Sequence, residues 1–275
     1  AAAPGAGGRG YVAIFEALAP LLACEAYRAT LCLGLVVSVG GITEHIAKDA
    51  QRALLCYLQE DTATEAHADE IATELLRIFD QVGCKDSSKE ARRVLAPLLG
   101  AVGVLLAEGC FPRASAGALL ERVLAAVRAS KDITRLRASV DVLVGLLRWP
   151  GPARPRALAA LLELLGYGFP TVRQATARAL YIRLLEEDGD LDLADGESQR
   201  AVPAARVAEV SELMTITPWS TDNEEVLVSA LHEVYAKLGL DLPAGGRSMV
   251  APKKPEAPKR PRENEYADLV RENHY

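Results

Sequence analysis

The sequence predicts an all-α protein: a HEAT- or armadillo-like α-solenoid fragment with a disordered C-terminal tail. Half of the 275 residues are hydrophobic, but only 5% are aromatic, and helix-forming Ala and Leu outnumber strand formers. Runs with helical periodicity, separated by short Gly or Pro breaks, fill residues 11–240. Because very short turns join adjacent helices all along the chain, we favour a solenoid over the alternative, a globular bundle of eleven helices.

The expected helices form pairs of about 35–45 residues, which is the scale of helix-pair repeats, although no exact sequence repeat is visible. In chain order they span residues 11–26, 28–39, 43–59, 65–82, 87–108, 115–129, 132–148, 153–167, 171–187, 204–216 and 223–238. The "VGG" at 39–41 fits a left-handed helix end, and the "WPG" at 149–151 fits a stop followed by a turn. Ser130 and Asp132 are candidate N-caps.

Composition divides the chain into a helical domain and two flanking segments. Residues 1–10 are a low-complexity linker, residues 11–240 are the helical-repeat domain, and residues 241–275 are a Pro- and charge-rich tail that we expect to be disordered. Residues 188–203 form an acidic loop within the domain. The chain begins without Met or a signal pattern, so we expect a fragment of a longer protein, with exposed apolar surface at its N-terminal edge.

Charge and cysteine usage narrow the functional class. A net charge of −6 argues against a general nucleic-acid-binding protein. The longest uncharged runs, 29–43 and 94–107, fall short of the ~20 residues that cross a bilayer, so we expect no membrane span. The five cysteines form no C-x-x-C pair, and we expect buried free thiols in a cytosolic protein. These are Cys24, Cys32, Cys56, Cys84 and Cys110.

No motif nominates an active site, so we expect no catalytic residue, no metal and no cofactor. The "GAGGRG" at 5–10 matches a dinucleotide-binding pattern, but no strand precedes it. The acidic loop fails as a calcium loop, since Leu193 and Gln199 stand where Gly and Glu are needed, and a solvated loop is favoured. The four histidines show no zinc-binding spacing, and there is no nucleophile elbow.

The tail contains one regular feature. Prolines recur at every third position from Pro252 to Pro261, which would align them on one face of a polyproline II helix. The basic residues between them suggest a docking segment for an acidic partner or a nuclear-import-like patch, although a solvated tail is the favoured alternative. These candidate docking residues are Lys253, Lys254, Lys259, Arg260 and Arg262.

The stretch "GFPTVRQATARALYIRLLEE" at 168–187 poses the choice between a binding surface and a packing unit. A helical wheel gathers Val172, Ala175, Ala179 and Ile182 into one apolar arc, which Thr176 and Leu180 widen. Three arginines five residues apart, at positions 173, 178 and 183, cannot line one face. We therefore expect the second helix of a HEAT-like pair, packed against the Leu158–Leu165 stripe of the preceding helix.

Four blocks of sequence resemble the tubulin-specific chaperone D family, also called tubulin-folding cofactor D. They are "LVVSVGGITEHIAKDAQRALLCYL" (35–58), "LAEGCF" (106–111), "SKDITRL" (130–136) and "WPGPARPRALAALLELLGYGFPTVRQATARALYIRLL" (149–185). The resemblance covers about residues 28–238 and corresponds to the family's C-terminal region. The acidic loop and the tail after Gly239 depart from the family pattern.

The resemblance implies a non-catalytic folding scaffold of the microtubule cytoskeleton. Members of this family bind β-tubulin after its release from the chaperonin, and with cofactors C and E they assemble the α/β-tubulin heterodimer. The complex stimulates GTP hydrolysis by tubulin, and the family also binds an Arf-like small GTPase. The alternatives are a HEAT-repeat scaffold for non-tubulin partners and a hydrolase or metalloenzyme.

Overall fold

The computed structural model describes residues 8–40, 43–59, 65–83, 89–128, 130–194 and 200–242. This part of the chain is all-α, with eleven α-helices, two short 3-10 helices and one two-stranded ladder. The elements are α1 (Gly8–Leu18), η1 (Ala19–Ala23), α2 (Glu25–Val39), α3 (Glu44–Gln59), α4 (Glu65–Gly83), α5 (Lys89–Ala107), η2 (Arg113–Ser115), α6 (Ala116–Arg128), α7 (Ile133–Leu146), α8 (Ala153–Leu165), α9 (Pro170–Leu185), β1 (Leu191–Asp192), β2 (Ala201–Val202), α10 (Ala204–Ile216) and α11 (Glu224–Leu238).

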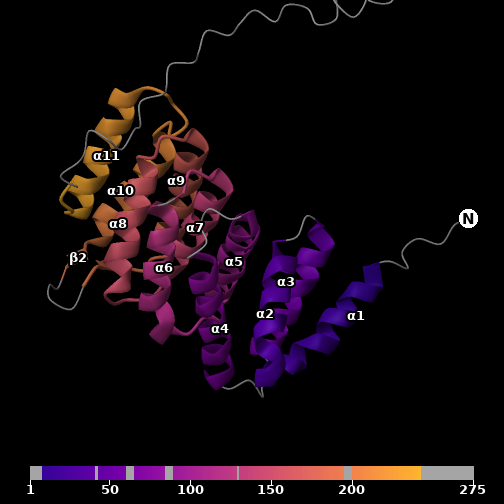
Figure 1. Ribbon diagram of the computed structural model, residues 1–275. Coiled ribbons are helices and arrows are strands. Elements are labelled where there is room, and N and C mark those ends of the chain that lie inside the picture. The colour runs from indigo at the N-terminus through magenta and orange to yellow at the C-terminus, as the bar shows by residue number, and fades with distance from the viewer. Residues whose placement is uncertain are drawn as a thin grey trace, which may run out of the picture.

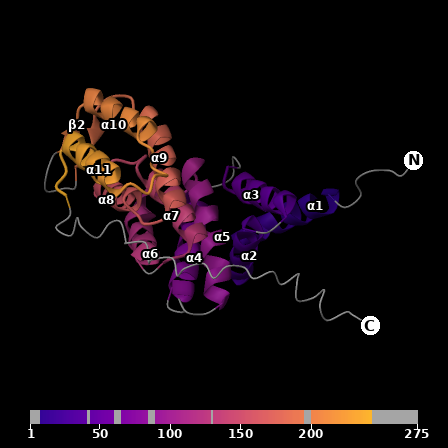
Figure 2. The ribbon, with the colours of Figure 1, turned by 90° about the horizontal axis from the view of Figure 1, so that it is seen from above.

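The helices stack in two rows, which confirms the predicted solenoid (Figure 1). Helices α2, α5, α7 and α9 each pack on the next, and α10 continues this row beside α9. Helices α4, α6 and α8 form the second row, and the pairs α4–α5, α6–α7 and α8–α9 join the rows (Figure 2). Each helix thus contacts mainly its chain neighbour and the next helix of its own row, as expected for a helical repeat.

A continuous apolar core lies between the two rows. Leu98, Leu106 and Leu119 are fully buried there, and the predicted stripe of α8 is confirmed. Its members Leu158, Leu161, Leu162 and Leu165 are all buried. None of the described helices is both long enough and apolar enough to span a membrane.

The N-terminal end differs from the expected single helix at 11–26. Helix α1 begins at Gly8, within the expected linker, and ends at Leu18, after which Pro20 opens the 3-10 helix η1. Proline lacks the backbone N–H that an interior helical position donates, so a break here is favoured. The apolar exposure expected at this edge is present, because Tyr27, Leu33 and Val37 of α2 are all exposed.

Local sequence signals determine the start of α7 more fully than the end of α2. Asp132 caps α7, accepting hydrogen bonds from the Thr134 and Arg135 amides, and the Ser130 hydroxyl accepts one from the Asp132 amide. Helix α2 ends at Val39, as the "VGG" predicted, but Gly40 is not left-handed, because its φ is −88°. Gly40 is needed for space instead: a Cβ there would lie 2.3 Å from Cβ of Pro97 in α5.

The acidic segment is not simply a solvated loop. Leu191 pairs with Val202 in the antiparallel ladder β1–β2, and the Leu193 amide donates to the Arg200 carbonyl at 2.7 Å. Leu191, Leu193 and Val202 are buried. Alternation of leucine with aspartate across 190–193 is the strand signal that the acidic composition obscured.

Candidate partner-binding groove

Helices α5, α7, α9 and α10 expose two connected hollows on the face of their row that points away from the core. The larger hollow, of about 980 Å³, runs between α7, α9 and the end of α10. The smaller, of about 360 Å³, lies between α5, α7 and α9. Asp141, Ala179 and Ile182 line both hollows, so we treat them as one surface, the α7–α9 groove.

Small residues keep the floor of the groove low. Gly100 and Gly103 of α5 face the smaller hollow, while Ala138 of α7 and Ala175 of α9 line the larger one. Gly145 has a different role, because a Cβ there would lie 2.7 Å from Cβ of Leu106. It lets α7 approach α5 closely, whereas a Cβ on Gly100 would meet nothing within 4 Å.

Apolar side chains are accessible in the larger hollow. Ile182 of α9 is 48% exposed and Ile133 of α7 is 37% exposed. Both line this hollow, together with the buried side chains of Met214 and Trp219. Exposed isoleucines that share a hollow are more informative than scattered ones, since monomeric proteins expose single apolar residues routinely.

The charges of the groove are divided between its two hollows. Arg137 and Arg178 line the larger hollow from α7 and α9; both are exposed, and neither makes an ion pair or hydrogen bond within the described residues. In the smaller hollow Arg148 lies 3.6 Å from Glu186 and donates to the Ala107 carbonyl. Desolvation by the surrounding helices raises the pKa of Asp141 at the junction, and the charge of Arg137 opposes this shift.

The other side of α9 buries two arginines that the helical wheel did not include in the packing arc. Arg173 is 1% exposed, and its guanidinium donates to the carbonyls of Trp219, Tyr167 and Thr221 at 2.8, 2.8 and 2.6 Å. It thereby ties the start of α9 to the loop between α10 and α11. Burial lowers the pKa of this guanidinium, and the charge of Asp222 opposes the shift.

Arg183 belongs to a buried ion-pair cluster with Arg154 of α8 and Glu187. The Glu187 carboxylate accepts from Arg154 at 2.5 Å and from Arg183 at 2.6 Å. Arg154 also donates to the Asp192 carbonyl, and Arg183 to the Leu147 carbonyl. The Glu187 carboxylate therefore joins α8 to α9, and Arg154 extends the cluster to the strand β1.

The predicted apolar arc of α9 is wrong in part. Val172 is buried, but Ala175 and Ala179 are only partly buried, and Ile182 is exposed. Thr176 and Leu180, which the wheel added to the arc, are buried as predicted. The buried face also carries Arg173, Ala177, Arg183 and Leu184. The arginines do fail to share one face, as predicted. The sequence analysis did not predict the groove. The signal that could have indicated it is the exposed Ile182, which lies one helical turn after the exposed Arg178.

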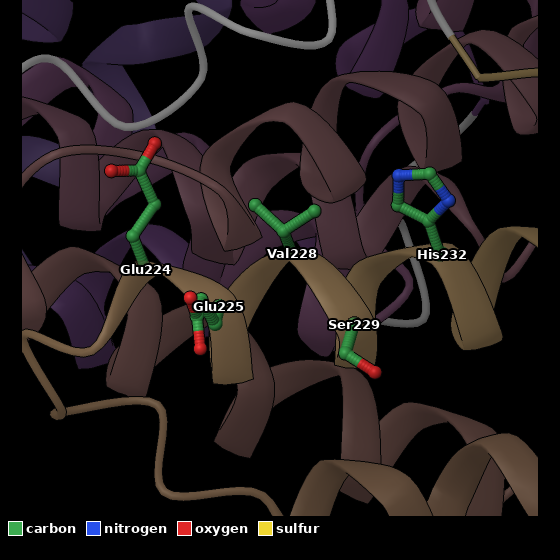
Figure 3. Close-up of a pocket in the computed structure, with 5 residues that line it drawn as sticks. All are labelled: Glu224, Glu225, Val228, Ser229 and His232. Atoms are coloured by element: carbon green, nitrogen blue, oxygen red, sulfur yellow. The ribbon is translucent and has the colours of Figure 1, made fainter.

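A further hollow of about 550 Å³ is lined by a single helix, α11. Figure 3 shows the side chains of Glu224, Val228 and His232 pointing to the same side of helix α11. Glu224 and Glu225 lie in the first turn of α11, where the helix dipole favours acidic side chains whether or not a ligand is present. This arrangement has a structural explanation and is not a candidate site.

The structure places the reactive residue types apart. No three His, Cys, Asp or Glu side chains of the described residues are grouped to hold a metal ion. The prediction of uniformly buried thiols is wrong, because Cys24 and Cys56 are exposed. Cys32 is buried, and desolvation raises its pKa to about 12, while Cys84 lies outside the described residues.

The basic docking segment from Lys253 to Arg262 also lies outside the described residues, as do most of the expected tail and residues 1–7 of the expected linker. Its proposed role therefore stays a prediction.

Comparison with known proteins tests the family resemblance. The family model described as tubulin folding cofactor D C terminal matches residues 11–135. Two of the four resembling blocks, 35–58 and 106–111, fall within this match, and the block at 149–185 lies beyond it. No solved structure matches the chain. Residues 11–135, from α1 to the start of α7, are therefore similar to the C-terminal region of tubulin folding cofactor D.

Proposed function

We propose that this chain is part of a tubulin-folding cofactor: a scaffold that binds β-tubulin after its release from the chaperonin. The single observation that carries the proposal is the family match over residues 11–135. In this proposal the chain helps cofactors C and E to assemble the α/β-tubulin heterodimer, and it contributes to tubulin GTP hydrolysis through the complex. An Arf-like small GTPase is a further proposed partner.

The architecture is compatible with such a role. A row of helices presents a long continuous surface, and a client can be held along it without a catalytic centre. The α7–α9 groove gives this surface accessible apolar side chains beside arginines that make no ion pair within the described part of the chain. GTPase stimulation would then follow from shaping bound tubulin. We place this activity in the cytoplasm, at the microtubule cytoskeleton.

Capture of tubulin is the direct test. The chain, immobilised through its N-terminus, is titrated with β-tubulin released from the chaperonin, and bound tubulin is measured by surface plasmon resonance. Saturable binding, absent with serum albumin, is the expected result. Retention of other cell proteins without tubulin would instead support a HEAT-repeat scaffold for non-tubulin partners.

We also propose that the basic residues from Lys253 to Arg262 contact an acidic partner surface. The support is their charge, five cations against one glutamate over residues 253–262. Replacing the five cations with alanine should weaken tubulin capture and flatten its salt dependence. Unchanged affinity and salt dependence would leave this segment as a solvated tail.

A further inference from the structure

The α7–α9 groove has the features of a site for a helix. Its larger hollow extends along two neighbouring helices, its floor carries small side chains such as Ala138 and Ala175, and Ile133 and Ile182 are accessible within it. We propose that this groove binds an amphipathic, acidic helix of a protein partner, with the partner's apolar face on the isoleucines and its carboxylates on Arg137 and Arg178.

The shape argues for a helix rather than an extended strand. The two walls are themselves helices, and the described part of the sheet is a two-residue ladder formed outside the groove, so no strand edge lies in it to extend. A helix that enters a groove between helices presents bulky side chains at i, i+3, i+4 and i+7. The low floor leaves room for such side chains.

The charge argues for an acidic partner. The charged side chains of the larger hollow are two arginines and one aspartate, which gives a net positive surface on a chain whose net charge is −6. Arg178 and Arg137 make no ion pair or hydrogen bond in the described structure, so each guanidinium is available to a partner carboxylate. Arg148 in the smaller hollow is already close to Glu186, so that end favours apolar contacts.

The two arginines also fix how the helix lies. They stand on opposite walls, one on α7 and one on α9, so carboxylates on both edges of the partner's apolar face would meet them. Complementary charge of this kind mainly sets specificity and association rate. A basic amphipathic helix of equal hydrophobicity should therefore be rejected.

The inference rests on the proposed scaffold function, yet it can be tested without tubulin. The probe is a fluorescein-labelled peptide of about 18 residues, designed with leucine at helical spacing and glutamate along both edges. A matched peptide carries lysine in place of every glutamate. Binding of each to the full chain is followed by fluorescence anisotropy.

The expected result is a reversal of preference. The acidic peptide should bind the native chain at least about tenfold more tightly than the basic peptide. The double variant Arg137→Glu, Arg178→Glu should lose the acidic peptide and gain the basic one. The control Arg128→Glu has the same change of charge at an exposed residue of α6 outside the groove, and it should leave both affinities unchanged.

Three results would overturn the inference. The first is equal binding of the two peptides to the native chain. The second is an unaltered preference in the double variant. The third is a large gain in acidic-peptide affinity when residues 243–275 are removed, which would make the chain's own tail the occupant. Peptide binding without tubulin capture would overturn only the proposed function, and tubulin capture without peptide binding would overturn only the groove.

Discussion

The two faces of α9 use the same residue type for opposite purposes. Arg173 and Arg183 point inward, where carbonyl oxygens and a buried carboxylate surround their guanidinium groups. Arg178 points outward into the groove and makes no ion pair among the described residues. The inner arginines therefore hold the scaffold together, and the outer arginine is available to a partner.

This difference shows that the surroundings of a charge, rather than its identity, determine its role. A buried guanidinium needs partners for its N–H donors. The loop after α10 supplies two carbonyls to Arg173, and Tyr167, just before α9, supplies a third. An exposed guanidinium is solvated by water and can exchange that water for a carboxylate. Substitutions on the two faces should therefore separate stability from binding.

The largest expected effect is on the inner face. Glu187→Gln leaves the buried Arg154 without its carboxylate and Arg183 with only the 3.8 Å contact to Glu186, so the free energy of unfolding should fall by about 3–5 kcal/mol. Urea denaturation followed by circular dichroism measures it. The control Glu186→Gln removes a half-exposed carboxylate in the smaller hollow and should cost less than about 1 kcal/mol. Equal effects would show that the cluster does not stabilise the interior.

The next largest effect is expected for Arg173→Met, which should also lower the free energy of unfolding. Methionine keeps much of the apolar stem, but the carbonyls of Trp219, Tyr167 and Thr221 lose their donor. We expect a loss of at least about 2 kcal/mol, measured by the same denaturation. The counterpart Arg178→Met should stay within about 0.5 kcal/mol of the native chain. A comparable loss in both variants would contradict the division between the two faces.

Replacing each of two glycines near the groove with alanine should change the free energy of unfolding in opposite directions. Gly145→Ala forces a methyl group against Leu106 and should destabilise by about 1–3 kcal/mol. The Cβ added by Gly100→Ala would contact nothing within 4 Å. Because alanine is favoured over glycine inside a helix, this variant should be more stable by about 0.5–1 kcal/mol. Thermal melting of the two variants compares them directly, and a stabilised Gly145→Ala would show that α5 and α7 are not in close contact there.

The smallest effect concerns Asp141. Its carboxyl pKa is raised above 3.8, so the folded state binds its proton more tightly than the unfolded state does. Ionisation then costs stability, and this cost grows as pH rises from about 3.8 through the folded pKa. Asp141→Asn should therefore be slightly more stable than the native chain at pH 7 and equal to it below pH 3.8. If Asp141→Asn were less stable than the native chain at pH 7, the predicted direction of the effect would be wrong.

Sequence patterns predicted the helices well because Ala, Leu and Gly/Pro breaks act locally. The bounds of α10 match those expected, and those of α3 and α8 differ by at most two residues. Burial within α9 was predicted poorly, because Arg173 donates to the distant loop at Trp219 and Arg183 donates to the Leu147 carbonyl that follows α7. A helical wheel drawn from one segment cannot include partners from such distant positions. The groove likewise depends on α5, α7, α9 and α10, whose spacing no local pattern specifies.

The central claim is that the outer face of α9 binds the client while the inner face stabilises the fold. Its most direct test is to measure β-tubulin affinity and the free energy of unfolding together for Arg178→Glu and for the control Arg128→Glu. We predict unchanged unfolding for both, about tenfold weaker tubulin binding for Arg178→Glu, and native binding for Arg128→Glu. Equal tubulin affinity in the two variants, at unchanged stability, would contradict the claim.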